Sequence, residues 1–243
     1  MDNITDAKKK ENTSDKDDDR EKDNDKADDV IKEYGVPGYI GYKKNIQFIS
    51  IIGEIEGHYV SSADKKTTKY EHIIPLLIGS QQDPAIEGLF IILNTIGGDV
   101  EAGLALAEMI KGIDKPKVSL VLGGGHSIGV PLATSTDLSI IVPSATMTIH
   151  PIRTTGLVIG VPQTFRYFQK MQQRINSFIL RTSNISEKTL VDLMYATDQL
   201  ANDIGTILVG EEAVNYGLID EVGDFSKAVS KLNELIKNKN KSL

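Results

Sequence analysis

The residues best suited to chemistry lie in a short glycine-rich segment, Gly125-His126-Ser127-Ile128-Gly129. This segment fits the G-x-S-x-G pattern, in which two glycines let the backbone turn sharply between a strand and a helix and present a serine hydroxyl. The amide that follows the serine then lies where it could stabilise an oxyanion. The pattern therefore indicates acyl transfer to Ser127, although a glycine-rich turn without chemistry has the same letters.

A serine nucleophile needs a base, and His150 is the histidine that best fits this role. It follows an alternating run, Thr146-Met147-Thr148-Ile149, and a strand end is a suitable place for a catalytic base. The competing interpretation is a strand histidine that only bonds a carbonyl. His126 adjoins Ser127, and neighbouring side chains normally diverge at such a turn. The other histidines, His58 and His72, lie in segments without a partner signature.

A second glycine pair, Gly97-Gly98, offers the other half of an oxyanion site. The pair follows an apolar run and precedes a helical pattern, so its backbone amides could bind an anion. A phosphate loop is excluded because no Walker lysine follows and G-x-G-x-x-G is absent. Acyl transfer needs two amide donors on one oxygen, which this pair and the serine segment could supply together. The alternative is a tight strand-to-helix turn.

Composition excludes several other kinds of chemistry. The chain has 243 residues and no cysteine, so disulfides, thiolate metal sites and cysteine nucleophiles are excluded. HExxH is absent and the histidines are not at ligand spacing, so we expect no metal and no cofactor. The net charge of −7 argues against a nucleic-acid partner. We find no apolar run of about 18 residues and no secretory signal, so we expect a cytoplasmic protein without a membrane span.

The elements that position these motifs alternate between strands and helices. Apolar runs predict strands at 46–55, 86–93, 118–122, 138–142 and 146–149. Helical spacing predicts helices at 70–78, 100–113, 127–135, 165–182, 186–195, 210–216 and 225–237. This alternation predicts an α/β fold with a mainly parallel sheet, formed by one domain over residues 36–235.

Two charged tails flank the predicted domain. Residues 1–29 contain 12 acidic and 7 basic side chains and few apolar ones. Such a segment cannot bury enough apolar surface to offset its ordering entropy, so we expect residues 1–35 to be disordered. Residues 236–243 are expected to form a short basic C-terminal tail.

Four motifs in order resemble those of the ClpP peptidase family. They are NTIGGDV with AGLA (94–105), GHSIG (125–129), PSATMTIHP (143–151) and EEAVNYGLIDEV (211–222). Their order and approximate spacing agree with that family from about residue 46 to 222. Two longer phrases, GGGHSIGVPLA and ATMTIHPIRTTGLVIGVPQTF, most resemble its translocation-enhancing branch.

The resemblance implies both a fold and a mechanism. It implies a ClpP/crotonase-like spiral of strand–strand–helix units with a protruding handle helix at 165–182. Ser127 would be the nucleophile and His150 the base, while the amides of Gly98 and Ile128 would form the oxyanion hole. An extended polypeptide substrate would be flanked by four residues: Gly124, Gly125, Thr155 and Gly156.

The same resemblance implies partners and an activity. Family members assemble into homo-oligomeric rings, and an ATPase unfoldase is a possible further partner. The implied activity is that of a serine endopeptidase acting on unfolded or extended polypeptides through an acyl-enzyme, with a possible link to protein export.

The acid of the triad is the least settled residue. Only Asp137 lies between Ser127 and His150, too close for the usual serine–acid–histidine order, so a later acid is expected. An ungapped alignment to the C-terminal motif puts Gly205 where the family has its aspartate. Asp203 is the nearer acid and the one we favour, with Asp198, or no acid, as alternatives.

Two other functions share part of this pattern. A crotonase-type acyl-CoA enzyme would use the same pair of amides on a thioester and would need neither Ser127 nor His150. A non-catalytic ClpP-like scaffold that assists secretion is the second, and the unsettled acid keeps it open.

Overall fold

The computed structural model describes residues 45–153, 160–198 and 204–241. The predicted N-terminal tail and the candidate residues Thr155, Gly156 and Asp203 lie outside these ranges. The strands are β1 (Ile46–Glu56), β2 (Thr67–Lys69), β3 (Gly88–Gly98), β4 (Lys117–Gly125), β5 (Leu138–Ile141), β6 (Thr146–Ile149), β7 (Thr206–Val209) and β8 (Glu221–Val222). The helices are α2 (Tyr70–Gln82), α3 (Val100–Gly112), α4 (Gly129–Thr134), α5 (Val161–Thr182), α6 (Glu187–Met194), α7 (Glu211–Asn215) and α8 (Phe225–Lys241).

The sheet is mainly parallel, as the alternation of strands and helices predicts. Its order is β2-β1-β3-β4-β5-β8, and all of these pairs are parallel. The last part of β4 turns to a different neighbour, because Gly124 pairs with Thr146 of β6, and β7 then runs antiparallel to β6. The end of β4 therefore lies where the sheet divides.

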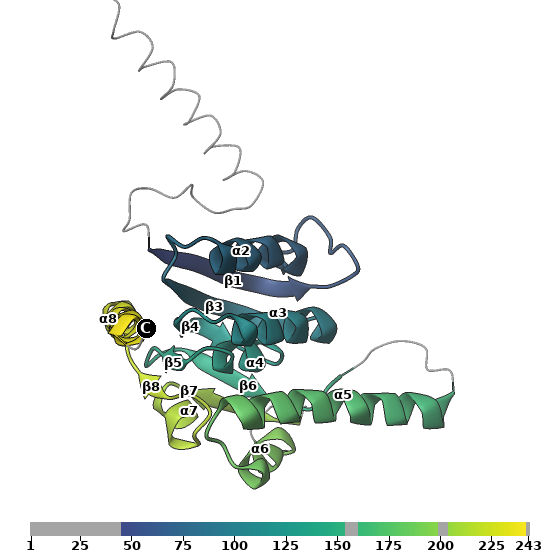
Figure 1. Ribbon diagram of the computed structural model, residues 1–243. Helices are drawn as coiled ribbons and strands as arrows, with labels where there is room; N and C mark the ends of the chain where they lie inside the picture. The colour runs from purple at the N-terminus through teal and green to yellow at the C-terminus, as the bar shows by residue number, and fades with distance from the viewer. Residues whose placement is uncertain (1–44, 154–159, 199–203, 242–243) are drawn as a thin grey trace, which may run out of the picture. The chain divides into compact units, whose positions relative to one another are not determined.

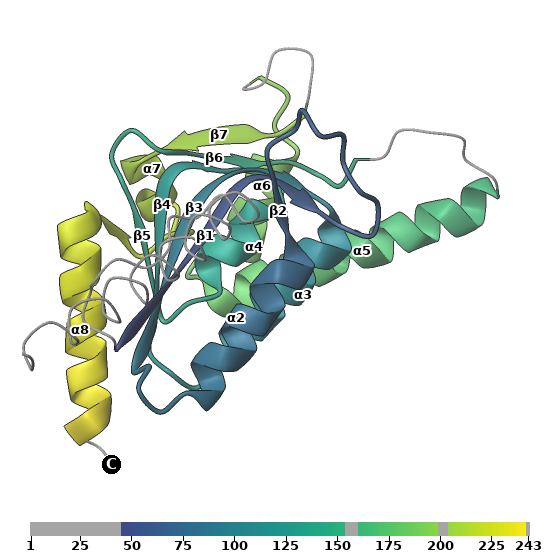
Figure 2. The ribbon, with the colours of Figure 1, turned by 90° about the horizontal axis from the view of Figure 1, so that it is seen from above.

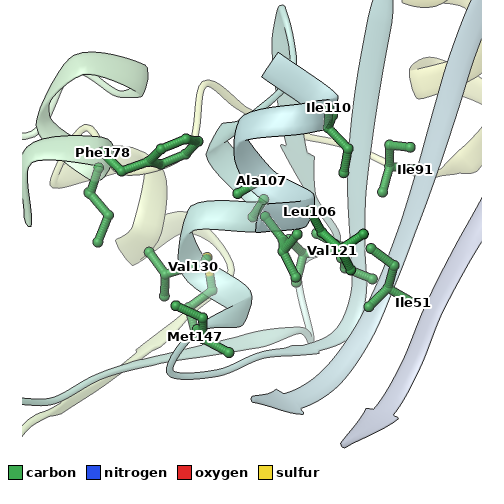
Figure 3. Close-up of a cluster of buried hydrophobic side chains, with 14 of the residues drawn as sticks. Ile51, Ile91, Leu106, Ala107, Ile110, Val121, Val130, Met147 and Phe178 are labelled. Carbon is green, nitrogen blue, oxygen red and sulfur yellow. The ribbon is translucent and has the colours of Figure 1, made fainter. Parts of the chain in front are cut away.

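Helices cover both faces of the sheet, which explains the long apolar runs of β3 and β4. Helices α2 and α3 pack on one face and α8 on the other (Figures 1 and 2). Figure 3 shows the larger core, which joins the sheet to α3, α4, β6 and α5 through Ile51, Ile91, Leu106, Ala107, Ile110, Val121, Val130, Met147 and Phe178.

Helix α8 corrects the predicted C-terminal boundary. The sequence predicts a domain that ends at residue 235, whereas the helix continues to Lys241. Ala228, Leu232 and Ile236 recur every four residues, so they form one apolar stripe, and all three are buried against the sheet. Ile236 therefore belongs to the core rather than to a tail.

Helix α5 is the predicted handle, and it begins at Val161, four residues before the predicted start. Pro162 lies in its first turn, where a proline costs no hydrogen bond. The helix runs past the sheet in both views (Figures 1 and 2). Its C-terminal half buries Phe178 and Ile179. None of the helices in the described ranges is long and apolar enough to cross a membrane.

Candidate active site

The site forms where β3 and β4 separate at their carboxyl ends. Their register shifts between Leu93 and Thr95, and there the side-chain oxygen of Asn94 accepts the Gly124 amide at 2.9 Å. The amide of His126 then donates to the Thr95 carbonyl at 3.1 Å. A point where strand order divides is where open α/β sheets usually bind ligands, and both glycine-rich motifs meet at this one.

Ser127 occupies a strained turn between β4 and α4. Its φ is +57°, and it is the one non-glycine residue in the described ranges with positive φ. Such a conformation costs on the order of 1–3 kcal/mol and persists only where surrounding bonds impose it. The Ser127 amide donates to the Thr148 carbonyl at 2.9 Å, and the Gly129 amide donates to the His126 carbonyl at 2.8 Å. The turn is thus the sharp one that G-x-S-x-G predicts.

The Gly97-Gly98 pair packs directly on this turn. A Cβ atom added to Gly97 would lie 2.7 Å from the Cβ of Ser127, so only glycine fits. The Asp99 amide donates to the Ile55 carbonyl of β1 at 2.9 Å. Because amides alternate along a strand, the Gly98 amide points away from β1.

Four of the predicted site residues share one cavity of about 160 Å³. Ser127, His150, Gly98 and Ile128 all line it. The remaining lining residues are Val100, Val130, Ile149, Ile152, Arg153, Ile175, Ile179 and Met194. The residues predicted as nucleophile, base and oxyanion donors therefore line one pocket, whose other lining residues are mainly apolar.

His150 is oriented by the backbone that follows it. Its Nδ1 lies 2.7 Å from the Pro151 carbonyl oxygen. A carbonyl only accepts hydrogen bonds, so this contact places the ring proton on Nδ1 and leaves Nε2 as an acceptor. An imidazole in this tautomer can take a proton from a serine.

Gly205, the residue before β7, packs directly against His150 and Ile149 at the end of β6. A Cβ on Gly205 would lie 2.8 Å from the Cβ of His150 and 2.4 Å from the Ile149 carbonyl oxygen, and the φ of this glycine is +133°. Arg153 adds a second link, because its guanidinium donates to the Ile204 carbonyl at 3.5 Å. Asp203, the favoured acid, lies just outside the described ranges, and Asp198 is exposed.

His126, the rival base, is turned toward β6. Its Nδ1 lies 2.7 Å from Oγ1 of Thr148, and its Nε2 lies 3.5 Å from Oγ1 of Thr146. Burial lowers the pKa of the His126 imidazole, and the charge of His150 lowers it further. His126 is not among the described residues that line the cavity.

The predicted substrate contacts of Gly124 and Gly125 need correction. Both glycines are buried inside the sheet. The Gly124 amide is already bonded to Asn94, and Gly125 pairs with Thr95 of β3. Strand β4 has neighbours on both sides at this point, so neither glycine is available to bind an extended polypeptide.

A larger cavity, about 430 Å³, lies between α3 and α5 and carries different chemistry. Arg174 donates to both carboxylate oxygens of Glu101, at 2.7 and 3.0 Å, and Arg181 pairs with Glu108. These charges neutralise one another, and the bond from Arg174 lowers the pKa of Glu101. Within the described ranges, no cluster of three or more His, Cys, Asp or Glu side chains could hold a metal ion.

Comparisons with known proteins agree with the motifs. A family model described as Clp protease matches residues 48–226. Translocation-enhancing protein TepA of Halalkalibacterium halodurans is 59% identical over 194 residues, which cover 80% of this chain and 76% of that protein. An ATP-dependent Clp protease proteolytic subunit of Streptococcus suis is 29% identical over 187 residues, covering 74% of this chain and 86% of the subunit.

A solved structure gives the same fold. A ClpP1 mutant from Listeria monocytogenes superposes with a TM-score of 0.60 at 20% sequence identity, covering 75% of this chain and 94% of that one. The ClpP/crotonase-like fold and the relation to the translocation-enhancing branch, both expected from the motifs, are thereby confirmed.

Proposed function

Because this chain belongs to the Clp protease family, we propose that it is a serine endopeptidase that hydrolyses unfolded or extended polypeptides. The observation that most supports this activity is the shared cavity, which is lined by Ser127, His150, Gly98 and Ile128 together. This combination contains the parts that acyl transfer requires: a nucleophile, a proton acceptor and two donors for an oxyanion.

In the proposed mechanism Ser127 Oγ attacks the carbonyl carbon of the scissile bond. Nε2 of His150 takes the serine proton, since Nδ1 already donates to the Pro151 carbonyl. The negative charge on the former carbonyl oxygen is stabilised by the amides of Gly98 and Ile128. His150 then protonates the leaving amine, and a water molecule activated by His150 hydrolyses the acyl-enzyme.

We assign the third position of the triad to Asp203. Gly205 packs against the backbone and Cβ of His150, and Asp203 is the acidic residue that comes two positions before this glycine in the chain. A carboxylate there would stabilise the imidazolium that forms during attack. Asp198 is the weaker candidate because it is exposed.

The cavity walls suggest what lies beside the scissile bond. Ile175 and Ile179 of α5 and Met194 of α6 form an apolar surface next to the serine. An apolar substrate side chain would bury its surface there, so we expect cleavage after apolar residues in extended segments.

Assembly into a homo-oligomeric ring is part of the proposal. On the N-terminal half of α5, Val161, Phe165 and Tyr167 are 67%, 63% and 53% exposed. Met171, Phe178 and Ile179 of the same helix are buried within their own domain. The exposed half suits contact with another subunit. Light scattering should then give an oligomer at micromolar concentration, and a stable monomer would contradict this part.

The names of the relatives support a proposal for the cellular setting. The 59% identical relative is called a translocation-enhancing protein, and others are proteolytic subunits of ATP-dependent proteases. We therefore infer a cytoplasmic peptidase that acts on polypeptides linked to export, with an ATPase unfoldase as a candidate partner.

A fluorophosphonate probe tests the proposed chemistry. The wild-type protein should be labelled at Ser127 and should degrade unfolded casein, whereas Ser127→Ala should do neither. Ser144→Ala is a matched control, because Ser144 is an exposed serine away from the cavity. A folded wild-type protein that is neither labelled nor active would favour the scaffold, and thioesterase activity that survives Ser127→Ala would favour the acyl-CoA enzyme.

A further inference from the structure

Two consecutive residues of the serine turn are bonded to a single residue of β6. The Ser127 amide donates to the Thr148 carbonyl at 2.9 Å, and Nδ1 of His126 contacts the Thr148 hydroxyl at 2.7 Å. Thr148 lies two residues before His150, which directly follows the last residue of β6. The nucleophile and the base are therefore joined through Thr148.

The His126 ring packs tightly between Gly124 of β4 and Thr148 of β6. A Cβ on Gly124 would lie 2.7 Å from Nε2 of His126, so a side chain at position 124 would displace the ring. The His126 backbone is fixed as well, since its amide bonds Thr95 of β3 and its carbonyl accepts from Gly129 of α4. A ring held in this way connects β4 to β6 beside the active-site turn.

We propose that His126 is a positioning residue whose bond to Thr148 holds the serine turn at a fixed distance from His150. The inference rests on the proposed peptidase function. His126 does not line the cavity that Ser127 and His150 share, so the inferred role is positioning rather than a direct part in the reaction. The lowered pKa of His126 keeps the ring neutral at neutral pH, which avoids a second positive charge when His150 takes the serine proton.

The expected signature is a change in kcat with little change in KM. A displacement of about 1 Å between reacting groups can reduce the rate about a hundredfold. The walls of the substrate cavity come from other residues, so binding should be nearly unaffected. A residue that served stability alone would lower the melting temperature and leave kcat of the folded fraction unchanged.

Two threonines on the same face of β6 give a matched test. Thr148→Val removes the hydroxyl that contacts Nδ1 and keeps the strand-favouring shape. Thr146→Val is the control, because the hydroxyl of Thr146 is 3.5 Å from Nε2 and too long for a strong bond. We expect kcat for a peptide substrate to fall tenfold to a hundredfold in Thr148→Val and less than threefold in Thr146→Val.

Substitutions of His126 separate positioning from proton transfer. His126→Asn keeps a polar atom near the place of Nδ1 and should retain most of kcat, whereas His126→Ala should lose as much as Thr148→Val. The double variant, His126→Ala with Thr148→Val, should be no slower than the worse single variant, because both remove one interaction.

Several outcomes would overturn the inference. These are equal rates for the two threonine variants, losses that multiply in the double variant, or His126→Asn as slow as His126→Ala. If the wild type is labelled by fluorophosphonate at Ser127 in those cases, the peptidase function stands and only positioning by His126 fails. An unlabelled, folded wild type would overturn both.

Discussion

Two strand-to-helix junctions face the same cavity and are built in opposite ways. At the β3–α3 junction, positive φ angles fall on Gly97 and Gly98, and Asp99 caps α3 by accepting the Ala102 amide at 2.8 Å. At the β4–α4 junction, the positive φ falls on Ser127. No side chain in the described ranges caps the six-residue α4.

This difference indicates that the β3–α3 junction serves stability and the β4–α4 junction serves the proposed reaction. The first junction gives the positive φ angles to glycines, which adopt them at no steric cost, and its helix terminus is capped, so it forms a rigid turn. The second keeps strain on a residue with a hydroxyl. The first amides of α4 are satisfied by backbone carbonyls rather than by a side chain, because Gly129 donates to His126 and Val130 donates to Ser127. We conclude that the fold concentrates its local strain at the proposed nucleophile.

The largest expected effect tests whether the second junction is the reactive one. Ser127→Ala and His150→Ala should each lower kcat by roughly 10⁶, and the double variant should lose no more than either, because both residues serve one step. Casein cleavage by the three variants measures this. Losses that multiply would mean that the two residues act independently.

The next effect concerns Asp203, the proposed acid of the triad. Asp203→Asn keeps the shape but removes the charge, so turnover should fall by up to about 10⁴. Asp198→Asn is the control and should change turnover less than threefold. If Asp203→Asn is fully active, the carbonyl of Pro151 is sufficient to orient His150.

A smaller effect is expected at the first junction. Asp99→Ala removes the cap of α3 and should reduce the free energy of unfolding by about 1 kcal/mol. Peptidase activity should change less than tenfold, because Asp99 lies outside the cavity lining. Urea denaturation with a parallel activity assay would show whether capping and chemistry are separate, and a complete loss of activity would contradict the comparison.

The smallest effect measures the strain itself. Both Ser127→Gly and Ser127→Ala should be inactive, yet glycine accepts a φ of +57° without steric cost. The glycine variant should therefore be more stable than the alanine variant by about 1 kcal/mol. Equal stability of these two variants would mean that the turn carries little strain.

Much of the fold can be predicted from local sequence patterns. The observed strands differ from the predicted ones where pairing with a neighbouring strand, rather than the local sequence, decides the structure. The β6 run alternates clearly and has the predicted bounds of Thr146 to Ile149. Strands β3 and β4 extend through their terminal glycines, which have low strand propensity, because neighbouring strands pair with them. The short β2 and β8 strands carry no periodic signal, since two or three residues cannot show one.

The site also contains residues that local motifs predict and residues that only the tertiary fold brings together. Ser127 and His150 can be proposed from sequence because their motifs are local, and the structure brings both to one cavity. The apolar wall was not, because Ile175, Ile179 and Met194 lie on helices whose spacing indicates only a buried face. The substrate contacts predicted for Gly124 and Gly125 need correction, because the local sequence does not show that the Gly124 amide bonds Asn94 and that Gly125 pairs with Thr95.

The burial of Ile236 has a practical consequence for anyone shortening this protein. Its side chain packs so closely on β3 that a Cβ on Gly88 would lie 2.7 Å from Ile236 Cδ1. Removal of the basic-looking end from residue 236 would uncover apolar surface around Phe90 and Leu232, both fully buried in the intact chain. A newly exposed patch of this kind promotes self-association. The shortened protein should aggregate during purification, although the deleted residues look like a harmless, solubilising tail.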